Sequence, residues 1–326
     1  MTLSGKKLLI TGGAGFIGSN LIERFITQNN TIVCLDNLAT GKLNNIRPFF
    51  DRSDFTFIEG DIRDYDTCRK AVEGVDVVLH QAAMGSVPRS IADPVTTNDV
   101  NIGGFVNMLT ATKEAGVKRF VYAASSSTYG DHPALPKKED QIGRPLSPYA
   151  VTKYVNELYA KVFSDLYGIE TIGLRYFNVF GRRQDPNGAY AAAIPKFIKL
   201  LITYQSPHIY GDGLQSRDFT YIDNVIQANE LAATVVQRRA LNTVYNIAFG
   251  DATTVVELIE TLKEYLSEFD PRIASVDPVK GEKRVGDILH SLASIDRARD
   301  LLSYQPEYDL RKGLKEAIRW YWENLQ

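Results

Sequence analysis

The stretch Thr11-Gly12-Gly13-Ala14-Gly15-Phe16-Ile17-Gly18 decides the fold class of this chain. It joins an apolar segment typical of a buried strand, Leu8–Thr11, to an amphipathic segment that predicts a helix, Ile17–Gln28. Because glycines at such a junction carry no side chains, backbone N–H groups can approach an anion that faces the positive end of the helix dipole. The stretch therefore predicts a βαβ unit with a binding site for the pyrophosphate of a dinucleotide.

Strand-like and helix-like segments alternate from this stretch through the first half of the chain. The expected strands are Leu8–Thr11, Thr31–Asp36, Phe55–Glu59, Val75–His80, Phe120–Ala124 and Thr171–Arg175. The expected helices are Ile17–Gln28, Tyr65–Val72, Asn98–Gly116 and Pro148–Tyr167. Because parallel strands are joined by right-handed crossovers, this alternation predicts an α/β fold with a doubly wound parallel (Rossmann) sheet.

The second half of the chain does not continue this alternation of strand-like and helix-like segments, and it predicts a smaller mixed α/β substrate domain. Further helices are expected over Ala191–Leu201, Asp223–Val235, Val255–Leu266 and Leu310–Asn324, with one more strand over Val244–Ala248. We expect residues 1–178 and about 219–248 to form the NAD-binding Rossmann domain. Residues from about 179 to 218 and 249–326 would form the substrate domain, with a cleft between the two.

Composition excludes several classes of function. The chain has 326 residues, 44% hydrophobic and 23% charged, and a formal net charge of −2, which gives no argument for nucleic acid or an anionic membrane as a partner. No apolar run approaches the ~18 residues of a membrane helix, and no signal peptide is visible. The two cysteines, Cys34 and Cys68, lack metal-ligand spacing, so we expect no metal site and a reducing, cytoplasmic location.

Acidic and small residues follow the other expected strands. Asp36 ends the second strand, eighteen residues after Gly18, where a carboxylate can accept hydrogen bonds from both ribose hydroxyls. The same carboxylate would repel a 2′-phosphate, which favours NAD over NADP. Asp61-Ile62 follows the third strand, and Gln81-Ala82-Ala83 follows the fourth. We therefore expect these segments to line the NAD site.

A tyrosine and a lysine four residues apart carry the expected chemistry. Tyr149 and Lys153 share one face of a predicted helix. A free tyrosine has a pKa of about 10, and a nearby ammonium together with the positive nicotinamide would lower it. Ser125 begins a serine run after the fifth strand and would supply a third hydroxyl. The three residues predict removal of a proton from a hydroxyl while a hydride leaves the same carbon.

The chain as a whole resembles extended short-chain dehydrogenases/reductases that modify nucleotide sugars. The resemblance rests on the glycine stretch, Asp36, Ser125, Tyr149 and Lys153. It narrows to UDP-sugar 4-epimerases, and among them to the UDP-N-acetylglucosamine 4-epimerase group of bacterial surface-polysaccharide pathways. The segments that narrow it are Met84–Ser90, Ala123–Asp131, Pro145–Tyr149, Arg175–Gly181 and Gly211-Asp212-Gly213.

The resemblance implies a mechanism and a set of site residues. Tyr149 takes the proton of the sugar 4-hydroxyl as hydride passes to a tightly held NAD, and the 4-keto sugar then turns over and receives the hydride on its other face. The implied NAD contacts are Gly12, Ala14, Gly15, Phe16, Ile17, Asp36, Asn37, Leu38, Thr40, Gly41, Asp61, Ile62, Gln81, Ala82, Ala83, Tyr149, Lys153, Tyr176 and Val179. The implied substrate contacts are Gly85, Ser86, Ser125, Ser126, Tyr149, Asn178, Ala192, Ala193, Phe197, His208, Tyr210, Arg217, Arg284, Asp287 and Ser291.

Particular substrate residues have particular implied roles. Arg217 and Arg284 match positions that clamp the diphosphate of a UDP-sugar. Ser291 stands where strict UDP-galactose epimerases have a large tyrosine, so it leaves space for an N-acetyl group. His208 and Tyr210 depart from the Tyr-Ile-Asn of the near relatives, which leaves their contacts with the nucleotide open.

Three other functions are considered for this chain, together with its oligomeric state. Ser127 and Thr128 stand where a 4,6-dehydratase would have Asp and Glu, so elimination is disfavoured. A UDP-glucuronate 4-epimerase stays open as the second candidate, and a non-catalytic NAD-binding sensor as the third. Excess apolar positions on the predicted helix Pro148–Tyr167 favour a homodimer through the helices near 98–116 and 148–167.

Overall fold

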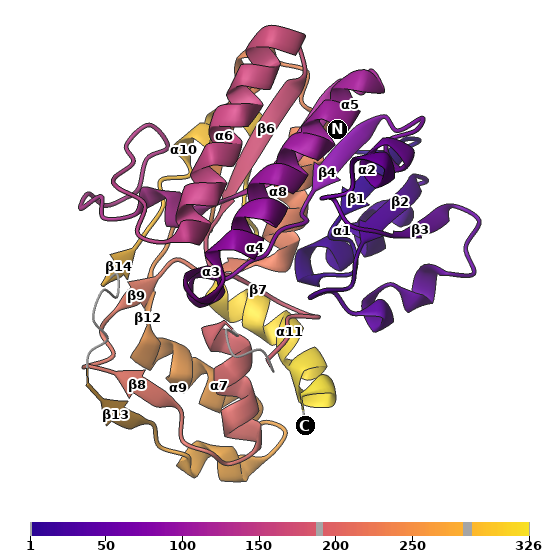
Figure 1. Cartoon of the computed structure of the whole chain (residues 1–326). Coiled ribbons are helices and arrows are strands. Elements are labelled where there is room, and N and C mark those ends of the chain that lie inside the picture. Colours follow the sequence, from indigo (N-terminus) through magenta and orange to yellow (C-terminus); the bar gives the residue numbers. More distant parts are fainter. Residues whose placement is uncertain (1, 187–191, 283–288, 326) are drawn as a thin grey trace.

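The centre of the molecule is a seven-stranded parallel sheet, which confirms the expected fold class (Figure 1). The computed structural model describes residues 2–186, 192–282 and 289–325. The sheet order is β11-β6-β5-β4-β1-β2-β3. Its strands are β1 (Lys7–Thr11), β2 (Thr31–Asp36), β3 (Phe55–Glu59), β4 (Val77–His80), β5 (Arg119–Ser125), β6 (Glu170–Tyr176) and β11 (Thr243–Ile247). The order reverses beside β1, and the carboxyl ends of strands at such a switch point form a ligand crevice.

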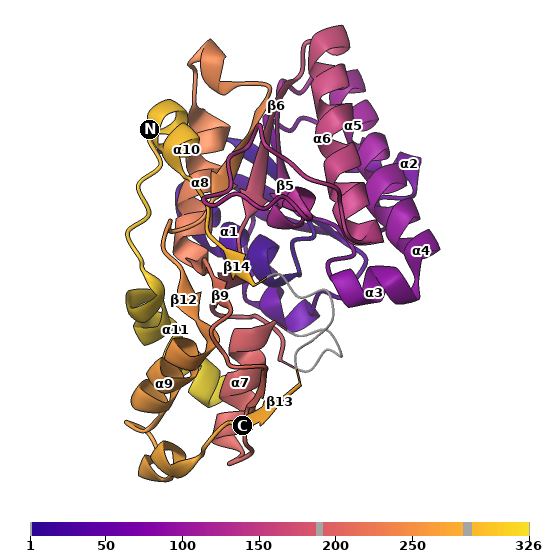
Figure 2. The same cartoon turned by 90° about the vertical axis from the view of Figure 1, so that its left-hand side faces the viewer.

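Helices cover both faces of this sheet (Figure 2). One face carries α1 (Phe16–Ile26) and α8 (Ile222–Thr234), and the other carries α2 (Tyr65–Ala71), α5 (Phe105–Glu114) and α6 (Pro148–Tyr167). Successive residues of β1 alternate between the two layers, because Leu8 and Ile10 belong to one apolar cluster and Leu9 to the other. Burial on both faces explains the unbroken apolar run of this strand.

The helix expected over Asn98–Gly116 begins earlier and is not uniform, so that prediction was wrong in part. The chain forms α4 (Pro94–Asn98), then wider π-helical turns over Asp99–Gly104, and then α5. Asp93 caps α4 by accepting a hydrogen bond from the N–H of Thr96 at 3.0 Å. A further short helix, α3 (Val87–Ala92), precedes it and was not expected.

The helix that carries Tyr149 has the expected bounds. Ser147 caps α6 by accepting from the N–H of Ala150 at 3.1 Å, and Gly168 ends it with a φ of 71°, which a glycine adopts without strain. The outer face of α6 exposes a row of large apolar side chains: Val151, Leu158, Tyr159, Val162, Leu166 and Tyr167. The apolar excess predicted from the sequence is therefore at the surface of the chain.

The second half of the chain builds a lower lobe and also returns to the sheet (Figure 1). The lobe holds α7 (Ala193–Ile202), α9 (Val255–Leu266) and α11 (Leu310–Asn324). Its short strands are paired as β8 (His208–Tyr210) with β13 (Val279–Gly281), β9 (Ser216–Arg217) with both β12 (Thr253–Thr254) and β14 (His290–Ser291), and β7 (Val179–Phe180) with β10 (Thr220–Tyr221). Within 249–326, the helix α10 (Asp296–Leu302) packs against α8 and β11 of the sheet. The expected domain boundaries stay a prediction.

Two negative findings apply to the parts of the chain that the structure describes. No helix there is long and apolar enough to cross a lipid bilayer. No group of three or more His, Cys, Asp or Glu side chains there is arranged to hold a metal ion. Both cysteines are free and buried, and burial raises the pKa of Cys68 to about 12.

Candidate active site

The glycine stretch forms a turn that has no room for side chains. Gly12 has a φ of 66°, and a Cβ on it would lie 2.7 Å from the backbone nitrogen of Ala82. A Cβ on Gly18 would lie 2.2 Å from the carbonyl oxygen of Gly12. The N–H of Gly15 donates to that same oxygen at 3.1 Å. The turn thus presents bare backbone and the start of α1 to the crevice, as a pyrophosphate requires.

Asp36 lies at the carboxyl end of β2 and is held by the turn. Its carboxylate accepts hydrogen bonds from the N–H of Ala14 at 2.9 Å and of Leu38 at 2.8 Å. Burial raises the pKa of Asp36, and these backbone hydrogen bonds counter part of that rise. A Cβ on Gly41 would lie 2.9 Å from Asp36 Oδ1. Ala14, Leu38 and Gly41 therefore support the carboxylate from behind and are not among the residues lining the cavity in front of it.

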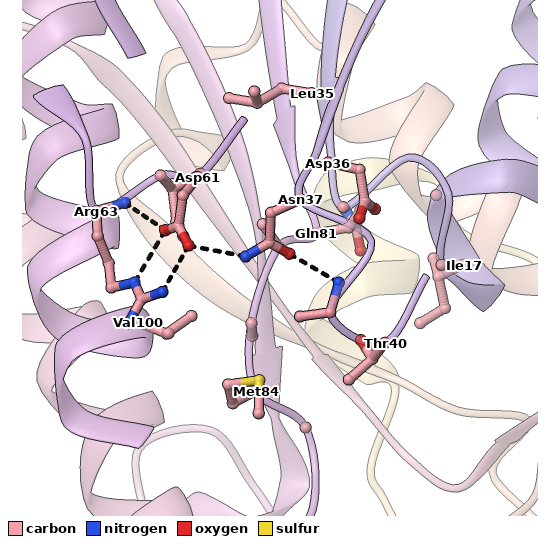
Figure 3. Close-up of a pocket in the computed structure, with 18 of the residues that line it drawn as sticks. Ile17, Leu35, Asp36, Asn37, Thr40, Asp61, Arg63, Gln81, Met84 and Val100 are labelled. Atoms are coloured by element: carbon pink, nitrogen blue, oxygen red, sulfur yellow. Dashed lines mark hydrogen bonds and ion pairs between the residues drawn. The ribbon is translucent and has the colours of Figure 1, made fainter. Parts of the chain in front are cut away.

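A cavity of about 380 Å³ lies in front of the turn and between the strand ends (Figure 3). On one wall, the guanidinium of Arg63 donates to Asp61 at 3.0 and 2.7 Å, and the amide of Asn37 donates to Asp61 at 2.8 Å. These bonds lower the pKa of Asp61 to about 2, so it stays ionised. The predicted residues that line the cavity are Gly12, Gly15, Phe16, Ile17, Asp36, Asn37, Thr40, Asp61, Ile62, Gln81, Ala82, Ala83 and Gly85. Gly18, the last glycine of the predicted turn, lines the cavity as well. The lining residues that the sequence did not indicate are Leu35, Ala39, Gly60, Arg63, Met84, Arg89, Thr96 and Val100.

The three candidate catalytic residues line one small cavity of about 250 Å³. Ser125, Tyr149 and Lys153 come from the end of β5 and the first turns of α6. This cavity shares lining residues with the first cavity, namely Ile17, Gln81, Ala83 and Gly85, and its remaining walls include Tyr176, Asn178 and Val179. The structure therefore brings the predicted reactive residues to the inner end of the candidate NAD site.

Burial dominates the electrostatics of the tyrosine and the lysine. The Nζ of Lys153 donates to the carbonyl oxygen of Ala123 at 2.9 Å and lies 5.9 Å from the centre of the Tyr149 ring. Burial lowers the pKa of Lys153 to about 8. Burial also raises the pKa of Tyr149, and a hydrogen bond with Ser125 counters part of the rise. The protein side chains alone therefore do not lower the tyrosine pKa.

Two buried asparagines, which the sequence did not indicate, form hydrogen bonds with residues that line these cavities. Asn229 of α8 donates to the hydroxyl of Tyr176 at 2.9 Å and accepts from the side chain of Gln81 at 3.3 Å. In the π-helical segment, Asn101 accepts from the N–H of Met84 at 2.7 Å and donates to the hydroxyl of Thr152 at 3.1 Å. Thr152 precedes Lys153, so this contact links the loop after β4 to α6.

A third cavity, of about 690 Å³, lies between the sheet edge and the lower lobe. It shares Asn178 and Val179 with the catalytic cavity. The other predicted residues that line it are Ala192, Ala193, Phe197, His208, Tyr210 and Arg217. Lining residues that the sequence did not indicate include Gln184, Lys196, Gln215 and Phe219. The guanidinium of Arg217 donates to the carbonyl oxygens of Ser216 at 2.9 Å and Leu289 at 3.3 Å.

Some predicted substrate residues do not line these cavities. Ser86, Ser126 and Ser291 are absent from the three linings, although Ser291 pairs in register with Arg217 across β14 and β9. Ser86 instead caps α3 by accepting from the N–H of Arg89 at 3.3 Å. Arg284 and Asp287 lie outside the described residues.

Comparison with known proteins agrees with this geometry. A family model described as the NAD dependent epimerase/dehydratase family matches residues 8–248. The chain is similar to a putative UDP-glucose 4-epimerase of Methanocaldococcus jannaschii, with 38% identity over 97% of this chain and 99% of the relative.

Two solved structures are similar over nearly the whole chain. UDP-N-acetylglucosamine 4-epimerase from Methanobrevibacter ruminantium, in complex with UDP-N-acetylmuramic acid, gives a TM-score of 0.90 and 39% identity over 98% of this chain and 99% of that one. UDP-glucuronic acid 4-epimerase from Bacillus cereus, in complex with UDP-glucuronic acid and NAD, gives a TM-score of 0.87 and 32% identity over 98% of this chain and 100% of that one. The resemblance inferred from the motifs is thus confirmed: the chain belongs to the NAD-dependent epimerase/dehydratase family, and its cofactor is NAD.

Proposed function

We propose that this protein interconverts UDP-N-acetylglucosamine and UDP-N-acetylgalactosamine by inverting the configuration at C4. One observation carries the proposal: the cavity of Ser125, Tyr149 and Lys153 shares walls with both the candidate NAD cavity and the cavity of Arg217. A sugar nucleotide whose diphosphate binds Arg217 would have its sugar beside Tyr149. The family to which the chain belongs supports the same reaction type.

The proposed roles follow from the chemistry of the three side chains. NAD, when bound, supplies the acceptor and donor of the C4 hydride, and its positive nicotinamide favours the phenolate of Tyr149. Tyr149 Oη takes the proton of the 4-hydroxyl as C4 becomes a carbonyl, and returns it after the keto sugar has turned over. Ser125 donates a hydrogen bond to the developing oxyanion and counters part of the rise that burial causes in the pKa of Tyr149. The ammonium of Lys153, on the same face of α6, would favour the phenolate of Tyr149 together with the nicotinamide.

The proposal also specifies which sugar the enzyme prefers. Gly85 lines the cavity of Tyr149, Ser86 follows it in the chain, and Ser291 lies in register with Arg217 of the third cavity. These small residues support an acetamido group at C2 and would also tolerate UDP-glucose and UDP-galactose. The solved relative with UDP-glucuronic acid favours UDP-glucuronate 4-epimerase as the second candidate. The intact Ser125, Tyr149 and Lys153 argue against a non-catalytic NAD-binding sensor.

We also propose that the active form is a homodimer through α5 and α6. The exposed apolar row on α6 includes Leu158, Val162 and Leu166, which are 50%, 48% and 68% exposed. Contiguous exposed apolar surface of this kind marks a protein interface. A cytoplasmic location stays a prediction that rests on the two unpaired cysteines.

A turnover assay tests the function. Purified protein is given UDP-N-acetylglucosamine, UDP-N-acetylgalactosamine, UDP-glucose or UDP-glucuronate, and products are identified by proton NMR, with Tyr149→Phe as the control. We expect fastest turnover with the two N-acetylated sugars and none in the variant. Turnover of UDP-glucuronate alone would overturn the sugar assignment but keep the mechanism, and no turnover of any sugar would favour the sensor.

A further inference from the structure

A buried carboxylate lies directly behind the candidate diphosphate site. Asp218 follows Arg217 in the link between β9 and β10, and it is completely buried. Within the described residues, no cationic side chain forms an ion pair with it. Its carboxylate oxygens instead accept hydrogen bonds from the backbone N–H groups of Phe249 at 3.2 Å, Gly250 at 3.2 and 3.3 Å, and Ala293 at 3.2 Å.

These hydrogen bonds join three segments that are far apart in the sequence. Phe249 and Gly250 follow β11, the last strand of the large sheet, whereas Ala293 follows β14 in the lower part of the molecule. The backbone oxygen of Asp218 also accepts from the side chain of Asn178 at 2.9 Å. Asp218 therefore contacts two residues that line the third cavity: Arg217 precedes it in the chain, and Asn178 donates a hydrogen bond to its backbone.

Only an acceptor-rich group satisfies this arrangement. An ionised carboxylate has two oxygens that accept and no hydrogen that donates, so it can receive several N–H groups at once. A protonated carboxyl accepts more weakly and adds an O–H, which finds no acceptor among these N–H donors. The geometry therefore depends on the negative charge of Asp218, although burying that charge costs free energy.

The surroundings of Asp218 make its charge sensitive to pH near neutrality. Burial raises its pKa to about 7, the three backbone donors counter part of the rise, and the nearby charge of Asp251 adds to it. Tyr304 lies beside Asp218 but donates its hydroxyl hydrogen to Ala248 at 3.0 Å. On the β9 side, His290 shares a hydrogen bond with the Ser216 hydroxyl at 2.9 Å, so it lies against the same segment.

We propose that Asp218 is a positioning residue for the substrate: its ionised carboxylate holds Arg217 and Asn178 in register with the turn at 249–250 and the segment after Ser291. The inference rests on the proposed function, because it takes Arg217 to bind the diphosphate. Asp218 itself does not contact substrate. Protonation of Asp218 releases the segment that carries Arg217, so affinity for the sugar nucleotide falls as pH decreases, while NAD stays bound.

The test measures binding of UDP-N-acetylglucosamine to the NAD-loaded protein by calorimetry at pH 8, 7 and 6. The Tyr149→Phe background prevents turnover, and the diphosphate diester keeps its charge over this range. With a pKa of about 7, the ionised fraction of Asp218 falls from about nine-tenths at pH 8 to about one-tenth at pH 6. If only the ionised form binds well, Kd rises about tenfold between those pH values.

The variant Asp218→Asn separates the contribution of this residue from those of other groups near the same segment, such as His290. We expect it to bind at pH 8 at least as weakly as the parent binds at pH 6, to lose most of the pH dependence, and to keep its NAD. Asp300→Asn, an exposed change of the same chemistry on α10, should leave the profile unchanged. Asp251→Asn removes a neighbouring charge and should move the pH midpoint of binding lower, which keeps the inference testable if Asp218→Asn does not fold.

The outcomes distinguish this inference from the proposed function. Binding that weakens with falling pH to the same extent in the parent and in Asp218→Asn would overturn the positioning role alone. An unchanged midpoint in Asp251→Asn would overturn it as well. Absence of UDP-sugar binding at every pH would overturn the proposed function, and the inference with it.

Discussion

Replacing Gly18 with alanine tests the link between the glycine turn and the cofactor. The added Cβ would lie 2.2 Å from the carbonyl oxygen of Gly12 and 2.7 Å from the Cα of Gly13. Both are backbone atoms, so the turn must move by about 0.8 Å to reach the 3.0 Å that real Cβ contacts require. Overpacking of this kind costs about 1 to 3 kcal/mol. The Gly15 N–H bond to the same oxygen adds about 1 kcal/mol if it breaks.

We therefore expect Gly18→Ala to lower the free energy of unfolding by about 2 to 4 kcal/mol and to purify without NAD. The thermal midpoint should fall by at least about 3 °C, and the NAD released on denaturation should be close to zero. Gly103→Ala is the matched control, because no atom lies within 4 Å of its added Cβ. A Gly18→Ala protein that keeps one NAD per chain and the parent midpoint would refute the reasoning.

Three further predictions concern the supports of the site and the outer face of α6. Glu157→Gln breaks a buried ion pair with Arg175, whose nitrogens lie 2.8 and 2.6 Å from its oxygens; urea unfolding should show a loss of about 3 kcal/mol, and a loss below 1 kcal/mol would contradict a buried pair. Asn229→Ala frees Gln81 beside the cofactor, so NAD content and kcat should fall while KM for the sugar changes little; a rise in KM alone would be the contrary result. Val162→Asp places a charge in the exposed apolar row and should convert a dimer to a monomer in light scattering, whereas an unchanged mass would exclude this face as the interface.

Sequence patterns predicted the parts of the fold that depend on local periodicity. The seven strands and most helices lie where apolar runs and amphipathic segments indicated, because burial on both faces of a parallel sheet leaves a strong local signal. The helix start at Pro94 carried a signal too, since an aspartate followed by proline is a common cap. The π-helical turns at Asp99–Gly104 carried none, because they depend on how Asn101 packs against the loop after β4.

The candidate site was predicted best where a motif places backbone at a fixed point. The glycine turn, Asp36, Tyr149 and Lys153 are such positions, and they line or support the expected cavities. Asn229 and Asp218 were missed because their partners come from distant segments, so a polar residue within an ordinary helix or link gives no local sign. Spacing shows a lysine near Tyr149 but not the depth of burial, so the rise that burial causes in the pKa of Tyr149 could not be predicted from the sequence.

The central claim is that C4 of the sugar loses a hydride to NAD and regains the same hydride, while Tyr149 moves only the proton of the 4-hydroxyl. The most direct measurement is epimerisation of UDP-N-acetylglucosamine by the NAD-loaded protein in D₂O, followed by proton NMR of the product. The account predicts UDP-N-acetylgalactosamine that still carries protium at C4, because the hydride passes to NAD and back while only the hydroxyl proton exchanges with solvent. Deuterium at C4 of the product, or no product, would contradict it.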